Sequence, residues 1–267
     1  MTNTTTQSTT IWSEIDYQTD AGLGAIAQIG MIVLDNDQTL SHEARQMLTI
    51  PGIALYESRL STARQDAPIS AGLLHDTFNG LEGALVQVNA RFPSKVIALG
   101  CTSAAMTIGA EELERRVHKA SPSAQVTDPF TGILAALRTL GARRIGYVSP
   151  YPRDVAEDMV RKIEKEGFVV PVAKGFHHEG SFIRHDAPFI SPESTANAVR
   201  AVVNEGDVDA VVVSCTQMRA AVAIDKLEQE IGKPVITSNQ ALCWHALRLA
   251  GYKQPVVGWG KLFERDI

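Results

Sequence analysis

Two cysteines stand at the ends of apolar, strand-like runs, and a threonine follows each of them. Cys101 comes after VIALG at residues 96–100, and Cys215 comes after AVVVS at residues 210–214. Helix-forming sequence follows both. We therefore expect each thiol near a helix N-terminus, with Thr216 as a cap, where free N–H groups and the helix dipole favour a thiolate. The same N–H groups can hold a substrate carboxylate.

Two thiols placed in this way support chemistry on opposite faces of one planar carbon. One thiol can take a proton while the other gives one, or one can attack as a nucleophile while the other manages the proton. A lone free cysteine is more often a small buried hydrophobe, and the matched pair favours the catalytic interpretation. Cys243 has no such match. Its neighbours Leu247 and Ala250, at helical spacing, indicate core packing.

Strand-like runs alternate with helical patterns along the chain, which predicts βαβ units, parallel sheets and an α/β fold. The expected strands are Ile29–Leu34, Val96–Gly100, Ile145–Val148 and Ala210–Val213, and the expected helices are Ile133–Leu140, Val155–Glu166 and Ala221–Ile231.

The second half of the chain repeats short words of the first half at nearly constant separation, which indicates a duplication. The pairs are Ile-Gly at 29–30 and 145–146, LGCT at 99–102 and VSCT at 213–216, and LRTLG at 137–141 and LRLAG at 247–251. Ligands of open α/β sheets bind beyond the carboxyl ends of the strands, where both cysteines are placed. We predict a first lobe of residues 21–135 plus 241–267, a second lobe of residues 136–240, and a disordered tail at residues 1–20.

Composition excludes several classes of partner. The chain has 267 residues, 45% of them apolar and 21% charged, and a net charge of −5, which offers no electrostatic footprint for nucleic acid or an anionic membrane. No apolar run reaches the length of a membrane span, and the opening MTNTTTQSTT lacks the features of a signal peptide. Three cysteines without short spacing fit reduced thiols, so we expect a cytoplasmic enzyme.

Histidines offer a weaker candidate site. His177, His178 and His185 have no carboxylate or cysteine at a ligand spacing, so we predict a solvated loop and no metal. His245 lies among apolar residues and is interpreted as a hydrogen-bonded core residue. The stretch 175–194 is long and irregular for a connection, and a cover over the site is one interpretation of it.

Four longer segments carry a family resemblance: GCTSA at 100–104, ALRTLGARRIGYVSPY at 136–151, SCTQMR at 214–219 and GKPVITSNQALCWHALRLAG at 232–251. In these segments the chain resembles the Asp/Glu racemase superfamily. Within it, the chain looks most like the branch that holds maleate cis–trans isomerase, arylmalonate decarboxylase and the ectoine-utilisation A proteins. The resemblance extends over about residues 27–265.

The resemblance implies two pseudosymmetric α/β lobes, each a parallel sheet flanked by helices, with the active site in the cleft between them. It implies no metal and no organic cofactor, and it makes Cys101 and Cys215 the catalytic pair. It also implies that Tyr151 hydrogen-bonds the substrate or an intermediate. The further substrate contacts that it implies are Asn36 or Asp37, Thr102, Ser103, Thr216 and Gln217.

The chain departs from the family pattern at two points. The isomerases favour Asn after the first strand, where this chain reads LDNDQT. Arylmalonate decarboxylases typically keep only the second cysteine, so the presence of both disfavours decarboxylation.

The resulting hypothesis is an isomerase or racemase of a small carboxylic acid, either a maleate-like diacid or an Asp/Glu-type amino-acid derivative. An arylmalonate-type decarboxylase and a non-catalytic small-carboxylate binding protein are the alternatives. We also expect a homo-oligomer, of a size that the sequence does not give.

Overall fold

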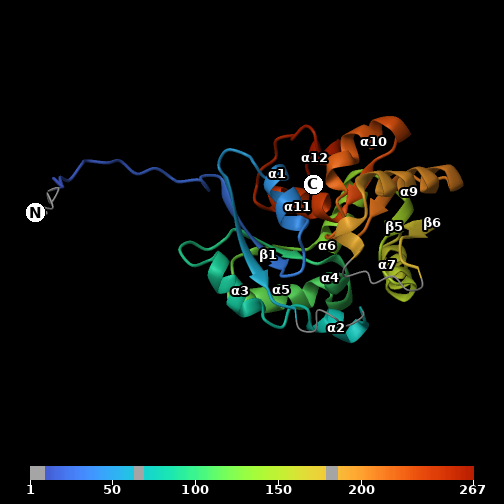
Figure 1. Ribbon diagram of the computed structural model, residues 1–267, viewed down its shortest axis with the longest axis horizontal. Helices are drawn as coiled ribbons and strands as arrows, with labels where there is room; N and C mark the ends of the chain where they lie inside the picture. Colours follow the sequence, from blue (N-terminus) through green and yellow to red (C-terminus); the bar gives the residue numbers. More distant parts are fainter. Residues whose placement is uncertain (1–9, 63–68, 179–185) are drawn as a thin grey trace, which may run out of the picture.

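The structure, a computed structural model, describes residues 10–62, 69–178 and 186–267. Two four-stranded sheets form its framework (Figure 1). The strands of the first sheet are β1 (Ala27–Leu34), β2 (Ile53–Leu60), β3 (Val96–Gly100) and β4 (Gln125–Thr127). The strands of the second sheet are β5 (Arg144–Ser149), β6 (Val169–Gly175), β7 (Ala210–Val213) and β8 (Val235–Thr237).

The two sheets have the same topology. The strand order is β2-β1-β3-β4 in the first and β6-β5-β7-β8 in the second, and every neighbouring pair is parallel. The predicted α/β fold with two related lobes is confirmed. In this repeat β1 corresponds to β5 and β3 to β7, so the two cysteine-bearing runs are equivalent strands.

Helices cover these sheets and connect the strands. The α-helices are α1 (Leu40–Met47), α2 (Ala71–Asp76), α3 (Leu81–Val88), α4 (Thr102–Ile108), α5 (Ala110–His118), α6 (Pro129–Thr139), α7 (Arg153–Lys165), α9 (Pro192–Glu205), α10 (Ile224–Ile231), α11 (Ser238–Leu249) and α12 (Gly260–Phe263). The described residues also form two short 3-10 helices, η1 (Ala187–Phe189) and η2 (Ala221–Ala223). Within the described ranges no helix is long and apolar enough to cross a membrane.

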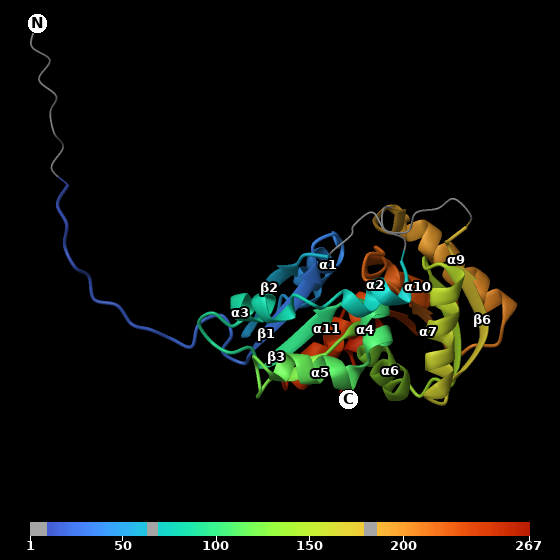
Figure 2. The ribbon, with the colours of Figure 1, turned by 90° about the horizontal axis from the view of Figure 1, so that it is seen from below.

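The equivalent helices α6 and α11 pack on each other between the two sheets, as both views of the ribbon show (Figures 1 and 2). Gly132 of α6 permits this contact, because a Cβ at that position would lie 2.7 Å from the carbonyl oxygen of Ala241 in α11. Helix α11 contacts β3 and β4 of the first sheet and β8 of the second. It is therefore buried nearly all round, as a helix in the middle of a core must be.

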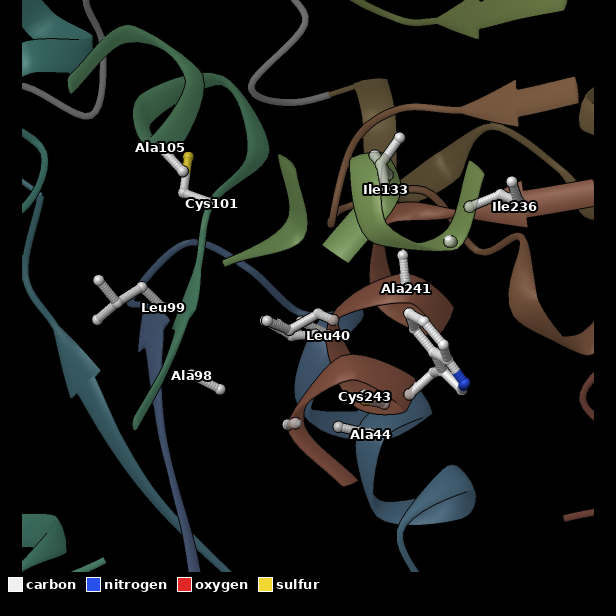
Figure 3. Packing of buried hydrophobic residues seen from close by; sticks show 14 of the residues in the cluster. Leu40, Ala44, Ala98, Leu99, Cys101, Ala105, Ile133, Ile236, Ala241 and Cys243 are labelled. Atoms are coloured by element: carbon white, nitrogen blue, oxygen red, sulfur yellow. The ribbon is translucent and has the colours of Figure 1, made fainter. Parts of the chain in front are cut away.

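Cys243 and His245 of α11 are core residues, as predicted. Cys243 is fully buried, and Figure 3 shows it on α11 beside Ala44 of the adjacent helix α1. His245 Nδ1 lies 2.7 Å from Thr127 Oγ1 at the end of β4, and burial lowers the pKa of this imidazole to about 4. The histidine is therefore a neutral hydrogen-bonding group inside the core.

Some predictions fall wholly or partly outside the described residues. Residues 1–9 of the predicted tail do so. The described residues 10–20 have no regular secondary structure and extend away from the sheets (Figure 2). Trp12 among them is 89% exposed. His185 and residues 179–185 of the proposed cover also lie outside. The division into lobes at 135/136 and 240/241 stays a prediction.

Candidate active site

A cavity of about 480 Å³ lies beyond the carboxyl ends of the central strands of both sheets. Cys101 follows β3 of the first sheet, and Cys215 follows β7 of the second after one intervening serine. Both thiols line this one cavity. The topology therefore brings together two groups that are more than 100 positions apart in the chain.

The turn at Cys101 is a direct passage from strand to helix. Cys101 has an extended backbone and is the N-cap of α4, and its side chain is visible at this junction in Figure 3. The thiol lies 3.8 Å from the hydroxyl of Ser103. Gly100 lets the strand end approach its neighbour, because a Cβ there would lie 2.9 Å from the Ile32 carbonyl oxygen and closer still to Leu40.

The turn at Cys215 differs from the prediction. No α-helix begins directly after this cysteine, and Thr216 caps none. An irregular stretch leads instead to the short 3-10 helix η2, and α10 begins only at Ile224. The expectation of a helix N-terminus is correct for Cys101 and wrong for Cys215, because this connection is held by side chains from elsewhere in the fold.

Three of these side chains come from α1 and α11. Thr39 Oγ1, at the start of α1, donates to the carbonyl oxygen of Gln217 at 2.8 Å. Glu43 Oε1 accepts from the Ala221 N–H at 3.0 Å. Asn239 Nδ2 donates both to Glu43 Oε2 at 2.7 Å and to the carbonyl oxygen of Thr216 at 2.9 Å. The first sheet's helix α1 thus positions the second sheet's cysteine.

Burial dominates the electrostatics of the two thiols. It raises the pKa of Cys101, while backbone N–H groups of Ala104 and Ser103 oppose that effect. It raises the pKa of Cys215 to about 12, although the Gln217 N–H and the Tyr151 hydroxyl favour the thiolate. Both groups are therefore thiols at neutral pH in the unliganded site, and the predicted bias toward thiolate is outweighed by desolvation.

Tyr151 belongs to the site and not to the surface. It lies in the turn after β5, is buried, and lines the cavity. Its hydroxyl interacts with the Cys215 thiol, and burial holds its own pKa well above the usual value. Tyr151 is therefore a neutral hydrogen-bond donor at the side of the second cysteine.

The structure brings most of the predicted contact residues to the cavity and leaves two behind it. The residues that line it are Asn36, Ser103, Tyr151, Thr216 and Gln217. Asp37 is buried behind the wall, where its Oδ1 accepts from the N–H groups of Thr39 and Leu40. Burial also raises the pKa of this carboxyl. Thr102 instead donates to Ser238 at 2.8 Å.

Two groups of site residues escaped the prediction. One is an apolar wall that comes mainly from α2 and its approach: Leu34, Ile69, Leu73 and Leu74. The other is the buried polar start of α11, Ser238 and Asn239, together with its partner Glu43. The second group had a signal in the sequence: two polar residues begin an otherwise apolar helical run directly after the short strand β8.

An α/β enzyme in which each of two related sheets contributes a thiol to one cavity is the class of protein that this fold and site define. A family model described as arylmalonate decarboxylase matches residues 79–263, and the chain belongs to that family. The resemblance to the branch of maleate isomerase and arylmalonate decarboxylase is thereby confirmed.

Named relatives refine this assignment. A maleate isomerase of Nocardia farcinica is 26% identical over 90% of this chain and 97% of its own length. A maleate isomerase of Pseudomonas putida is 30% identical over 62% of this chain and 68% of its own. These relatives identify the chain as an enzyme of the isomerase type.

Solved structures agree in fold. A Cys-to-Ser variant of the Nocardia farcinica maleate cis–trans isomerase, solved with a covalently bound succinylcysteine intermediate, superposes with a TM-score of 0.79 at 24% identity. The match covers 90% of this chain and 99% of that one.

Proposed function

We propose that this chain is a cofactor-independent isomerase or racemase of a small carboxylic acid, with Cys101 and Cys215 as its catalytic pair. The observation that carries the proposal is the entry of one thiol from each sheet into the same cavity. The substrate lies between the thiols, which act on opposite faces of one carbon. Three free cysteines fit a reducing compartment, so the cytoplasm is part of the proposal. The homo-oligomer stays a prediction.

On a saturated substrate the pair acts as two acid–base groups. One cysteine first loses its proton to solvent, and this thiolate is the minor form at neutral pH because burial raises the pKa of both thiols. The thiolate removes the proton from Cα, and the electron pair moves into the carboxylate to give an enediolate. The thiol of the other cysteine then delivers a proton to the opposite face, which inverts the centre. The first cysteine ends as a thiol and the second as a thiolate, so the charges balance.

On an unsaturated diacid the same pair catalyses cis–trans isomerisation, with one cysteine as the nucleophile and the other as the group that manages the proton. One thiolate adds to an alkene carbon, and the π electrons move onto the adjacent carbon and its carboxylate. The former double bond is now single and rotates. Expulsion of the thiolate restores the double bond in the other geometry, and no substrate C–H bond has to break.

Both routes develop negative charge on the carboxylate end of the substrate. Neutral donors support that charge: the Tyr151 hydroxyl, the Ser103 and Thr216 hydroxyls, and the amides of Asn36 and Gln217 all line the cavity. Asn36 Oδ1 and Gln217 Oε1 are buried acceptor atoms without a partner among the described residues, so they can accept from a donor group of a ligand. The NH2 groups of the same two amides donate to its carboxylate. Fixed donors of this kind stabilise an enediolate without reorganisation.

The cavity also has room for a substituent. Its volume of about 480 Å³ is within the ~300–1,000 Å³ range of pockets that hold drug-sized ligands, and a four-carbon diacid needs less. Ile69 and Leu73 line it on the side of α2. The proposal therefore includes substrates whose carboxylate-bearing carbon carries a small apolar group.

Turnover in D2O tests the proposal and separates its two routes. The purified protein is incubated with maleate, its 2-methyl derivative, and aspartate and glutamate derivatives, and products are read by mass spectrometry at low conversion. A saturated substrate that racemises should gain deuterium at Cα, because thiol protons exchange with water. An unsaturated diacid should isomerise with little exchange.

Two results would overturn this proposal. Release of CO2 during turnover would favour the decarboxylase instead. Binding without turnover, at an affinity that the double substitution C101A/C215A leaves intact, would favour a non-catalytic carboxylate-binding protein.

A further inference from the structure

One buried hydroxyl group connects the two cysteine turns. Ser238 Oγ accepts a hydrogen bond from Thr102 Oγ1 at 2.8 Å and a second from the backbone N–H of Cys215 at 3.0 Å. Thr102 is the residue after Cys101. The side chain of Ser238 thus contacts the first turn one residue from its thiol and the second turn at the cysteine itself.

The next residue of α11 strengthens this connection. Asn239 Nδ2 donates to the carbonyl oxygen of Thr216, the residue after Cys215, and to Glu43 of α1. Ser238 and Asn239 together hold both ends of the Cys215–Thr216 segment, one by accepting from its first N–H and the other by donating to its last carbonyl. The irregular turn gains through them the fixed geometry that a helix would otherwise supply.

The start of α11 is itself held firmly. Thr237 caps the helix in a capping box with Gln240, in which each side chain bonds the other residue's backbone N–H. Ser238 is 0% exposed, and the helix that follows it packs against α6 and both sheets. A displacement of Ser238 would therefore disturb the core, which makes it a rigid reference for both turns.

The connection is not a by-product of the fold's repeat. The helix equivalent to α11 is α6, which begins with Pro129 after the cap Asp128. Proline has no side-chain hydroxyl or amide to offer. The bridging serine occurs on one side of the pseudosymmetric pair only, on the side where no helix follows the cysteine.

We propose that Ser238 is a positioning residue that sets the spacing and orientation of the Cys101 and Cys215 thiols. Its effect on catalysis rests on the function proposed above, whereas its effect on the two thiols does not. Reacting groups must meet in a narrow range of geometry, and a misplacement of about 1 Å costs on the order of 10²-fold in rate. Removal of the hydroxyl leaves the Cys215 N–H and the Thr102 hydroxyl buried without an acceptor.

The substitution S238A tests the proposal by kinetics. We expect kcat to fall by about 10- to 100-fold while KM changes by less than about threefold, because substrate contacts stay and the geometry of the thiols changes. S58A is the matched control. Ser58 is also buried and donates to Gln87 Oε1 at 2.6 Å between β2 and α3, and neither residue lines the cavity. Its loss should leave kcat at the wild-type value.

Thiol labelling gives a readout that needs no substrate. Brief iodoacetamide treatment followed by peptide mapping measures the reactivity of Cys101 and Cys215 in each variant. S238A should change the labelling rate of both cysteines by more than about threefold, and S58A should change neither. If no substrate of the wild type is found, the proposed function fails while this measurement still decides the role of Ser238.

Thr102, which donates to Ser238, allows a second variant and a double-mutant cycle. T102V removes the donor and should reproduce part of the S238A effect, and T102S keeps the hydroxyl and should stay within about threefold of the wild type. In S238A/T102V the second change should add little, because both substitutions break one connection. Full additivity, or wild-type labelling of both cysteines in S238A, would overturn the proposal.

Discussion

The turn that carries Cys101 and the turn that carries Cys215 lie at equivalent strand ends but are held in different ways. The first is held mainly by its own helix: the strand passes into α4 at the cysteine, and bonds such as that of Thr107 Oγ1 to the Ser103 carbonyl at 2.9 Å lie within one helical turn. Its bond to α11, from Thr102 to Ser238, is added to this local framework. The second has no such helix. Side chains of α1 and α11 hold it from far along the chain.

The difference shows that a pseudosymmetric fold can place two cysteines at equivalent positions although different hydrogen bonds hold the two turns. Local hydrogen bonds form whenever α4 forms. The bonds around Cys215 exist only when both sheets and α11 are assembled. We therefore expect the geometry of the second thiol to be the more sensitive to substitutions outside its own turn.

The largest expected effect is loss of turnover when either thiol is removed. C101A and C215A should each lower kcat by at least about 10³-fold, since each leaves one face of the substrate without its acid, base or nucleophile. Circular dichroism should show an intact fold, because a small substitution at a strand end removes few packing contacts. Activity assays on both variants check this.

C243A is the control for that comparison. Cys243 is a buried core residue away from the cavity, so its loss costs some stability and should leave kcat unchanged. Substantial turnover in C101A, with none in C215A, would mean that only Cys215 is required for catalysis. That result would favour the decarboxylase, which uses a single cysteine.

The next effect concerns the pH dependence of stability through Glu43. Burial raises the pKa of this carboxyl from 4.5 to about 7 in the folded protein. The folded state therefore holds the proton more tightly than the unfolded state does. The resulting stabilisation is fully present below pH 4.5 and is lost as the pH rises through 7, by up to about 3 kcal/mol.

E43Q tests this expectation by chemical denaturation at several pH values. In the wild type the free energy of unfolding should fall between pH 5 and 8, partly because of Glu43. In E43Q this fall should be smaller by the contribution of Glu43. E228Q is the matched control, because Glu228 is also buried with a raised pKa and accepts from two backbone N–H groups, those of Val235 and Lys261. Both variants should flatten the profile, and only E43Q should lower kcat. Equal kinetics in the two variants would contradict the role of α1 in holding the Cys215 turn.

The fold and the catalytic candidates were predictable from local sequence. Strands end where apolar β-branched runs meet Gly100 or Ser214, and parallel strands end at one edge of a sheet, so the cysteines had to meet a common cavity if the halves were related. The repeated words at Gly30 and Gly146 lie in the equivalent strands β1 and β5.

The supports of Cys215 were not predictable in this way. The sequence CTQMRAAVAID after a strand predicts a helix. The chain is irregular there because of hydrogen bonds to Glu43 and Asn239, which are remote in sequence. The placement of Thr102 behind the cavity has the same origin, since its partner Ser238 is remote in sequence. Periodicity reports which face of an element is apolar, and it carries no information on which buried polar groups pair.

The smallest expected effect is also the most direct comparison of the two turns. Thr39 Oγ1 donates to the Gln217 carbonyl beyond Cys215, and Thr107 Oγ1 donates to the Ser103 carbonyl beyond Cys101. T39V and T107V each remove one hydroxyl-to-carbonyl bond, which is worth about 1 kcal/mol. T39V should also lower kcat severalfold, because the Gln217 carbonyl loses a remote anchor next to the second thiol. T107V should leave kcat unchanged, because the backbone of α4 still fixes Ser103. Denaturant titration and steady-state kinetics on the pair measure both quantities. A kinetic effect of T107V equal to that of T39V would mean that the two turns are equally sensitive, whatever their construction.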